Sequence, residues 1–138
     1  MPSELRICVI VNPALPPGLL ANTVAAIGIG LGAAAPQLAG TRLTDGAGRS
    51  IAVSSNRPVP ILQADAATLG QLLQRALEGE RDRVVVPFPA FARALHDFAD
   101  YEAAFPGRDL SQEVIDGIGL GGPSKWVRSL TGALKLLR

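Results

Sequence analysis

The chain has 138 residues, which is enough to bury one continuous core but too few for two independent ones, so we expect a single domain over residues 1–138. Apolar residues make up 48% of it, charged residues only 18%, and the formal net charge is +1. Binding to nucleic acid or to anionic lipid needs clustered, uncompensated Lys and Arg, so this balance disfavours both. The single cysteine is typical of a reducing compartment, and with no apolar run long enough to span a bilayer we expect a cytoplasmic protein.

The first half of the chain predicts a central strand, a long helix and a hairpin. Residues 7–11 form a short β-branched apolar run, typical of a strand that is covered on both faces. Residues 19–31 carry apolar side chains at helical spacing with alanines between them, so this helix should be buried nearly all round. Gly28 and Gly30 would let another element approach it. The segment at about 38–57 then predicts a hairpin-like excursion from the core.

The middle of the chain predicts an edge strand followed by a capped helix. Residues 59–63 have strand character, but prolines beside and within the segment withhold ladder hydrogen bonds and favour the edge of a sheet. Asp65 can cap the next helix, which Gly79 ends. The apolar stripe of this helix comprises Leu69, Leu72, Leu73, Ala76 and Leu77.

The last third predicts two more strands and two more helices. Residues 83–86 form a second buried strand, and the proline-rich segment 87–89 leads into a helix. Residues 114–120 can form a late strand, after which Ser124 opens a final helix that ends at Gly132. Strands thus alternate with helices, which favours a layered α/β domain around a mostly parallel or mixed sheet.

The glycine-rich run 117–122 has two readings. It matches a dinucleotide-binding fingerprint between a strand and a helix, but the chain ends too soon after it for the second strand that carries the ribose-binding carboxylate. No cofactor is therefore expected, and the alternatives are an anion pocket before Ser124 or a structural turn. The basic residues of the last segment either steer an anion there or complement the helix dipole. They are Lys125, Arg128, Lys135 and Arg138.

Few residues offer other chemistry. His96 with Asp97 and Asp100 could form a base oriented by a carboxylate, but i to i+4 pairs such as Arg93 with Asp97 and His96 with Asp100 are ordinary on a helix surface, and we favour that interpretation. Cys8 alternates within an apolar strand and is interpreted as an inert core residue. With one His, one Cys and no compact carboxylate set, neither a metal site nor a catalytic residue is predicted.

The closing segment carries a family resemblance. Residues 117–123 and 127–137 resemble the end of archaeal and eukaryotic type II peptidyl-tRNA hydrolases, which close with a Gly-Ile-Gly-x-Gly strand and a Thr-Gly-x-Leu-Lys-Leu tail. A closer resemblance is to a bacterial family known as domain of unknown function number two thousand, which is grouped with that hydrolase fold. It is carried by residues 9–11, 15–18, 21–22, 100–102 and 130–132. The resemblance implies a three-layer α/β/α sandwich on a mixed sheet of about four core strands, often assembled as a dimer.

The resemblance does not extend to the hydrolase site. The Gly-Lys-Gly-Lys stretch of those enzymes falls on residues 18–21, which carry no cation, and their Gln-Cys-Ser-His stretch falls on residues 25–28. Their Asp-Ala-Gly-Arg-Thr block has no counterpart in residues 88–91. Cleavage of an RNA ester needs positive charge to position phosphates and a group to activate water, so hydrolase activity is not expected.

Three functional hypotheses remain. The leading one is a small-ligand binding or regulatory module, a homodimer, with its cleft at the carboxyl end of the first strand. The candidate cleft residues are Asn12, Asn22, Tyr101, Ser124 and Lys125. The two asparagines could equally satisfy turn and helix-end backbone groups. The alternatives are a hydrolase of peptidyl-tRNA or a related ester, and a homo-oligomeric interaction protein that uses its Ala/Gly-rich first helix as the contact.

Overall fold

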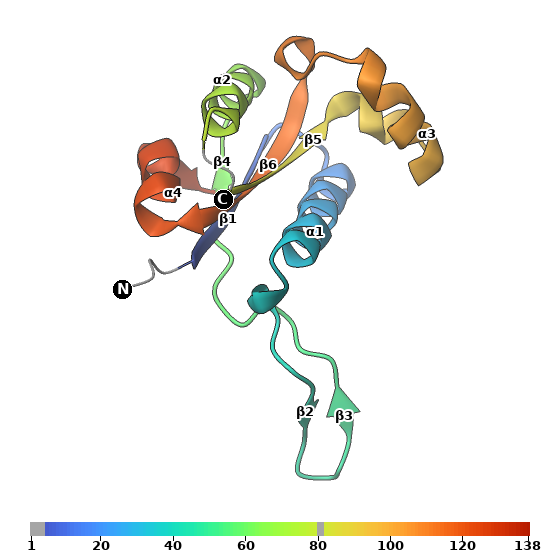
Figure 1. Cartoon of the computed structure of the whole chain (residues 1–138), viewed down its shortest axis with the longest axis vertical. Helices are drawn as coiled ribbons and strands as arrows, with labels where there is room; N and C mark the ends of the chain where they lie inside the picture. Colours follow the sequence, from blue (N-terminus) through green and yellow to red (C-terminus); the bar gives the residue numbers. More distant parts are fainter. Residues whose placement is uncertain (1–4, 80–81) are drawn as a thin grey trace.

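A mixed sheet forms the centre of the computed structural model, which describes residues 5–79 and 82–138 (Figure 1). Within these residues the sheet has five strands in the order β5-β6-β1-β4-β7. They are β1 (Leu5–Val11), β4 (Ile61–Gln63), β5 (Val84–Pro89), β6 (Ile115–Pro123) and β7 (Lys135–Leu136). β1 is parallel to β4 and antiparallel to β6, which is antiparallel to β5. The mixed α/β sheet is thus confirmed, with the short β7 added to the four expected strands.

Helices cover both faces of this sheet. They are α1 (Pro17–Ala34), α2 (Ala66–Leu77), α3 (Phe98–Ala104) and α4 (Ser124–Thr131). α1 packs on one face, where Ile27 and Leu31 lie against Val9 of β1. α2 and α4 pack on the other, where Leu69 and Val127 share an apolar layer with strand residues. Figure 1 shows these two helices together on one side of the sheet, α1 on the other, and α3 beyond the β5 edge.

Glycines in β6 let α1 approach the sheet closely. A Cβ atom on Gly119 would lie 2.4 Å from Cγ2 of Ile27 and 3.0 Å from Cδ1 of Leu31. A Cβ atom on Gly117 would lie 3.0 Å from Cγ2 of Thr23. Real Cβ atoms do not approach other atoms as closely as 2.4 Å, so the glycines of this strand are required by the position of α1.

The glycine-rich run is strand from end to end. The sequence predicts that the strand stops near residue 120, but β6 continues to Pro123 because β1 pairs with its residues 117–123. Leu5 lies opposite Pro123 and Val11 lies opposite Gly117. The run therefore forms no phosphate-binding turn between residues 117 and 122, and α4 begins only after it, with Pro123 as its N-cap residue.

The prediction that residues 59–63 form an edge strand is wrong. β4 lies between β1 and β7, and the backbone N–H of Leu137 donates to the carbonyl of Ile61 at 2.8 Å. Both prolines precede the first strand residue, so no ladder donor of β4 itself is lost. Pro60 still contributes, because its carbonyl accepts from the N–H of Val9 at 3.0 Å.

α1 is less buried than the sequence predicts. Its buried residues are Thr23, Ile27 and Leu31, whereas the side chain of Ile29 is 75% exposed. A Cβ on Gly30 would come within 2.9 Å of Val86, so the close packing expected at this glycine is present, although Gly28 has nothing within 4 Å. By length and apolar composition α1 would also pass as a membrane-crossing helix, a test that buried core helices and signal sequences near an N-terminus pass as well. The apolar character of α1 thus exceeds what its contact with the sheet uses.

The helix predicted after residues 87–89 is replaced by several shorter elements. β5 continues through Pro89, because its outer edge has no partner strand and a proline there withholds no needed donor. A 3₁₀ turn (Ala90–Ala94) follows, and the backbone at Leu95 and Asp97 is extended before α3 begins. Asp97 caps α3 by accepting from the N–H of Ala99 at 3.0 Å.

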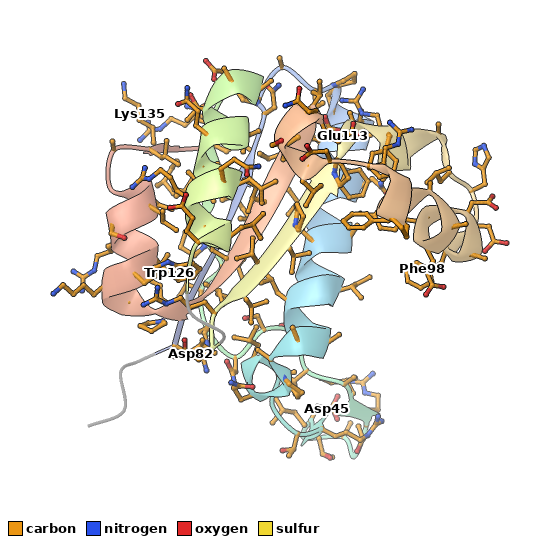
Figure 2. The ribbon with its side chains drawn as sticks, turned by 45° about the horizontal axis from the view of Figure 1, so that its top comes forward. Asp45, Asp82, Phe98, Glu113, Trp126 and Lys135 are labelled. Atoms are coloured by element: carbon orange, nitrogen blue, oxygen red, sulfur yellow. The ribbon has the colours of Figure 1, made fainter. Side chains whose placement is uncertain are left out.

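A hairpin projects from the body of the molecule (Figure 1). Its strands are β2 (Leu43–Thr44) and β3 (Ser50–Ile51), and they pair antiparallel. Asp45 shapes the turn by accepting from the N–H groups of Ala47 and Arg49, each at 2.9 Å. Figure 2 shows Asp45 at the far end of the hairpin, away from the sheet.

Candidate functional site

A basic pocket lies where β1 begins and β6 ends. Its volume is about 340 Å³, and its lining brings together residues from β1, from the return of the hairpin and from α4. The lining residues are Leu5, Arg6, Ile7, Arg57, Pro58, Pro60, Ser124 and Arg128. Three arginines that are far apart in the sequence therefore meet at one end of the sheet.

Local hydrogen bonds fix two of these arginines. Nη1 of Arg57 donates to the carbonyl of Leu5 at 2.8 Å, and its Nε donates to Oδ1 of Asn56 at 2.8 Å. Nη1 of Arg6 reaches Oγ of Ser124 at 3.4 Å. Arg128 follows Ser124 by four residues on α4, so both lie on the same side of that helix. The pocket is thus built from the start of β1, the start of α4 and the loop that returns from the hairpin.

Among residues 5–79 and 82–138, no carboxylate compensates the charge of the pocket. In the part of the chain that the structure describes, no carboxylate oxygen lies within 4.0 Å of Arg6, Arg57 or Arg128. The ion pairs of this part lie elsewhere, and they are Arg49–Asp45, Arg83–Asp82, Arg93–Asp116 and Arg108–Glu113. Guanidinium groups bind carboxylates and phosphates through planar, paired hydrogen bonds, so this arrangement suits a small anion.

The five residues predicted for one cleft do not meet in one place. Asn12 follows the carboxyl end of β1, whereas Ser124 and Lys125 lie beside its amino end, because β6 runs antiparallel and pairs Leu5 with Pro123. Ser124 lines the basic pocket and Lys125 is exposed next to it. The prediction of one common cleft at the carboxyl end of β1 is therefore wrong, because the pairing of β1 with β6 places Ser124 and Lys125 at the other end of the strand.

The other three candidates have separate surroundings. Oδ1 of Asn12 accepts from the N–H of Ala14 at 2.9 Å, which is the turn role that the sequence left open. Asn22 is exposed on the first turns of α1. Tyr101 stacks on Phe91 with ring centroids 5.6 Å apart, and burial raises the pKa of its hydroxyl. A role of these three residues in ligand binding stays a prediction.

The sequence reasoning missed a buried ion pair at the opposite end of the sheet. Phe88 pairs with Gly117 and Pro89 with Ile115, so Asp116 forms a bulge that re-aims its side chain. This carboxylate is 1% exposed, and both its oxygens accept from the guanidinium of Arg93, at 2.5 Å from Nε. These hydrogen bonds raise the pKa of Arg93.

The ion pair replaces the surface pairs that the sequence predicts. Among the described residues Arg93 does not pair with Asp97, nor His96 with Asp100, because the helix that would space them is interrupted at residues 95–97. The position of Asp116 inside an apolar strand is the one signal in the sequence, but its partner could not be predicted because it is 23 residues away. The pair fastens the segment after β5 to β6.

Two further features bear on chemistry. Cys8 is 3% exposed, and burial raises the pKa of its thiol to about 12, so it is no thiolate nucleophile near neutral pH. Over residues 5–79 and 82–138 no group of three His, Cys, Asp or Glu side chains could hold a metal ion. The basic pocket is therefore the one described cluster whose composition indicates a ligand class.

Comparisons with known proteins find relatives whose function is unknown. The profile of a family described as protein of unknown function (DUF2000) matches residues 5–138. A solved structure of a protein of unknown function from Agrobacterium tumefaciens strain C58 is similar, with a TM-score of 0.87 and 25% sequence identity over 96% of this chain and 97% of that one. A search of curated proteins gives no match.

Proposed function

The chain belongs to the DUF2000 family, and we propose that it is a binding module whose basic pocket holds a small anionic ligand. The observation that carries this proposal is the convergence of Arg6, Arg57 and Arg128, none of which has a carboxylate within 4.0 Å among the described residues. Guanidinium groups that line one pocket repel one another, so a bound anion would stabilise an arrangement that keeps them together.

The shape of the pocket narrows the ligand class. A volume of about 340 Å³ lies at the lower end of the range for small-molecule sites. Its lining combines hydrogen-bond donors, from the guanidinium groups and from Ser124, with apolar residues such as the prolines at 58 and 60. A compact molecule with a phosphate or carboxylate group fits this combination better than a large aromatic or neutral one.

Titration with inorganic phosphate, pyrophosphate and citrate at low salt tests the proposal. Saturable binding of at least one probe in the millimolar range or tighter is expected, together with weakening by added salt. Arg128→Ala and Arg6→Ala should each weaken that binding about tenfold, since a charge-assisted hydrogen bond contributes roughly 1.5–3 kcal/mol. The matched control is Arg138→Ala, which removes an exposed arginine that does not line the pocket. Binding of no probe, or equal binding by all three variants, would overturn the proposal.

The finer features implied by the resemblance are proposals as well. A type II peptidyl-tRNA hydrolase-like fold is supported by β1 at the centre of a mixed sheet with helices on both faces. Absence of hydrolase activity is supported by residues 18–21, which read Gly-Leu-Leu-Ala where those enzymes carry lysine. Turnover of peptidyl-tRNA by the purified chain would contradict this. A cytoplasmic location is supported by the single cysteine, and fractionation of cells that express a tagged chain tests it.

A further inference from the structure

The β2–β3 hairpin presents an apolar pair to solvent. Leu43 and Ile51 are cross-strand partners, so their side chains lie on the same face of the hairpin, and they are 59% and 53% exposed. A two-stranded hairpin of this size is marginally stable alone, and it stands clear of the sheet in Figure 1. Its local hydrogen bonds fix the turn, but they leave this apolar pair without a cover.

A second apolar surface lies between α1 and α3. It is a groove of about 540 Å³ beside the β5 edge, and its lining is predominantly apolar. Ile29 of α1 and Phe98 of α3, which are 75% and 71% exposed, stand on this surface. Figure 2 shows Phe98 on α3 and Asp45 on the hairpin as separate parts of the molecule, and no residue of the hairpin lines this groove, so the hairpin of the same chain does not fill it.

We infer that the occupant of this groove is the hairpin of a second copy of the chain, so that two copies exchange hairpins in a symmetric dimer. The charges match this arrangement. The hairpin carries Arg42 and Arg49, of which only Arg49 is paired, with Asp45 at 2.7 Å. Asp97 lies in the lining of the groove, and Glu102 lines an adjoining hollow that shares Phe98 and Tyr101 with it. Both carboxylates are exposed and have no salt-bridge partner in the described ranges.

Two-fold symmetry makes the exchange self-consistent. In a closed dimer each surface patch meets its complement twice, so hairpin and groove on one chain satisfy groove and hairpin on the other. This covers four large apolar side chains per chain that a monomer leaves in water: Ile29, Leu43, Ile51 and Phe98. The contact would thus cover Ile29, which is the exposed large apolar side chain of α1. The inference is independent of the proposed anion pocket, which lies at another part of the molecule.

Sedimentation equilibrium of the whole chain tests the exchange. The wild type should be a dimer, and Ile51→Asp should raise its dissociation constant by at least about tenfold, because an unpaired charge would enter an apolar contact. The matched control is Val114→Asp, an equally exposed apolar residue at 56% that lies outside both surfaces. Circular dichroism and the thermal midpoint verify that each variant is folded.

A charge exchange identifies the partner surface. Arg42→Glu and Glu102→Arg should each weaken the dimer and change its salt dependence, and the double variant should recover much of the wild-type affinity. A wild type that stays monomeric at high concentration would overturn the inference, and so would a dimer that Ile51→Asp leaves intact. Failure of the double variant to recover would exclude the contact between hairpin and α3.

Discussion

A single methyl group on Gly119 should destabilise the protein measurably. The substitution Gly119→Ala places a Cβ 2.4 Å from Cγ2 of Ile27 and 3.0 Å from Leu31, whereas ordinary contacts begin near 3.4 Å. α1 must therefore move outward by about 1 Å or Ile27 must leave its rotamer. Gly121→Ala is the matched control, because it lies on the same strand and the same face and its Cβ would meet Ile7 and Val84 at 3.6 Å.

The magnitude follows from two opposing effects. Overpacking a well-filled core costs about 1–3 kcal/mol, and the short distance at Gly119 places this variant near the upper end of that range. Alanine loses less backbone entropy than glycine when a strand forms, which returns roughly 0.5–1 kcal/mol at either position. Gly119→Ala should thus lower the free energy of unfolding by about 2 kcal/mol, while Gly121→Ala should leave it unchanged or raise it by up to about 1 kcal/mol.

Equilibrium unfolding in urea gives both values. The chain has one tryptophan, Trp126, which is 9% exposed in the core, so its fluorescence reports loss of tertiary packing and circular dichroism checks the same transition. All variants are compared at one protein concentration, because association would add to the stability. Ile27→Ala combined with Gly119→Ala should cost less than the sum of the single changes by more than about 1 kcal/mol. Equal stability of Gly119→Ala and Gly121→Ala would refute the close seating of α1 on β6.

Three other perturbations probe polar groups. Arg93→Ala leaves the buried carboxylate of Asp116 without its partner and should lower the free energy of unfolding by about 2–3 kcal/mol, less than the ~3–5 kcal/mol of a fully buried pair because the Arg93 side chain is 40% exposed. Arg93→Lys should restore only part of this loss. If urea unfolding shows no loss of stability in Arg93→Ala, the pair does not have this role. Hydrogen bonds from Thr68 lower the pKa of Asp65, so the ionised side chain stabilises the fold above the ordinary carboxyl pKa of 3.8, and this stabilisation is lost as the pH falls below that value. Asp65→Asn keeps a hydrogen-bond acceptor, so the unfolding midpoint of this variant should depend less on pH in the acid range. If the pH dependence is unchanged, other groups cause the loss of stability in acid. Burial raises the pKa of Cys8 from 9.0 to about 12, so between these pH values the folded state keeps a proton that the unfolded state loses, and the free energy of unfolding should fall by at most about 1.4 kcal/mol per pH unit. Cys8→Ala should make this fall less steep. Equal pH dependence in both proteins would argue against a buried neutral thiol.

The parts of the fold that the sequence predicted well are those with local signals. Asp65 accepts from the N–H of Thr68 at 2.8 Å, as its position before an apolar stripe predicts, and four residues of that stripe are buried. Leu77 departs from the pattern, being 49% exposed at the end of α2. α4 begins after Pro123 with Gly132 as its C-cap, because capping residues act within one turn of the helix they end.

The candidate site could be predicted only in part, because it is assembled by strand register. From the sequence, Ser124 and the basic residue at 128 were compatible with an anion pocket or with charges that complement the helix dipole. The choice between the two depended on which residues from other parts of the chain lie beside them. Arg6 and Arg57 reach this place only because β1 pairs with β6 from its first residue and the hairpin returns beside it. Likewise, Asp116 looks like a polar interruption of a strand until the bulge turns it toward Arg93.

The two charged places at opposite ends of the β1–β6 ladder differ in what they can offer an anion. Arg93 already donates to both oxygens of Asp116, so the local charge there is balanced and an incoming anion meets a carboxylate as well as a cation. Arg6 and Arg128 meet no carboxylate within 4.0 Å among the described residues, so the described side chains at the other end offer an anion cations without a paired carboxylate. An anion should therefore bind beside α4 and not at the carboxyl end of β1, where the sequence predicts the ligand cleft. If Arg93→Ala weakened phosphate binding and Arg128→Ala did not, the ligand would belong to the opposite end of the sheet.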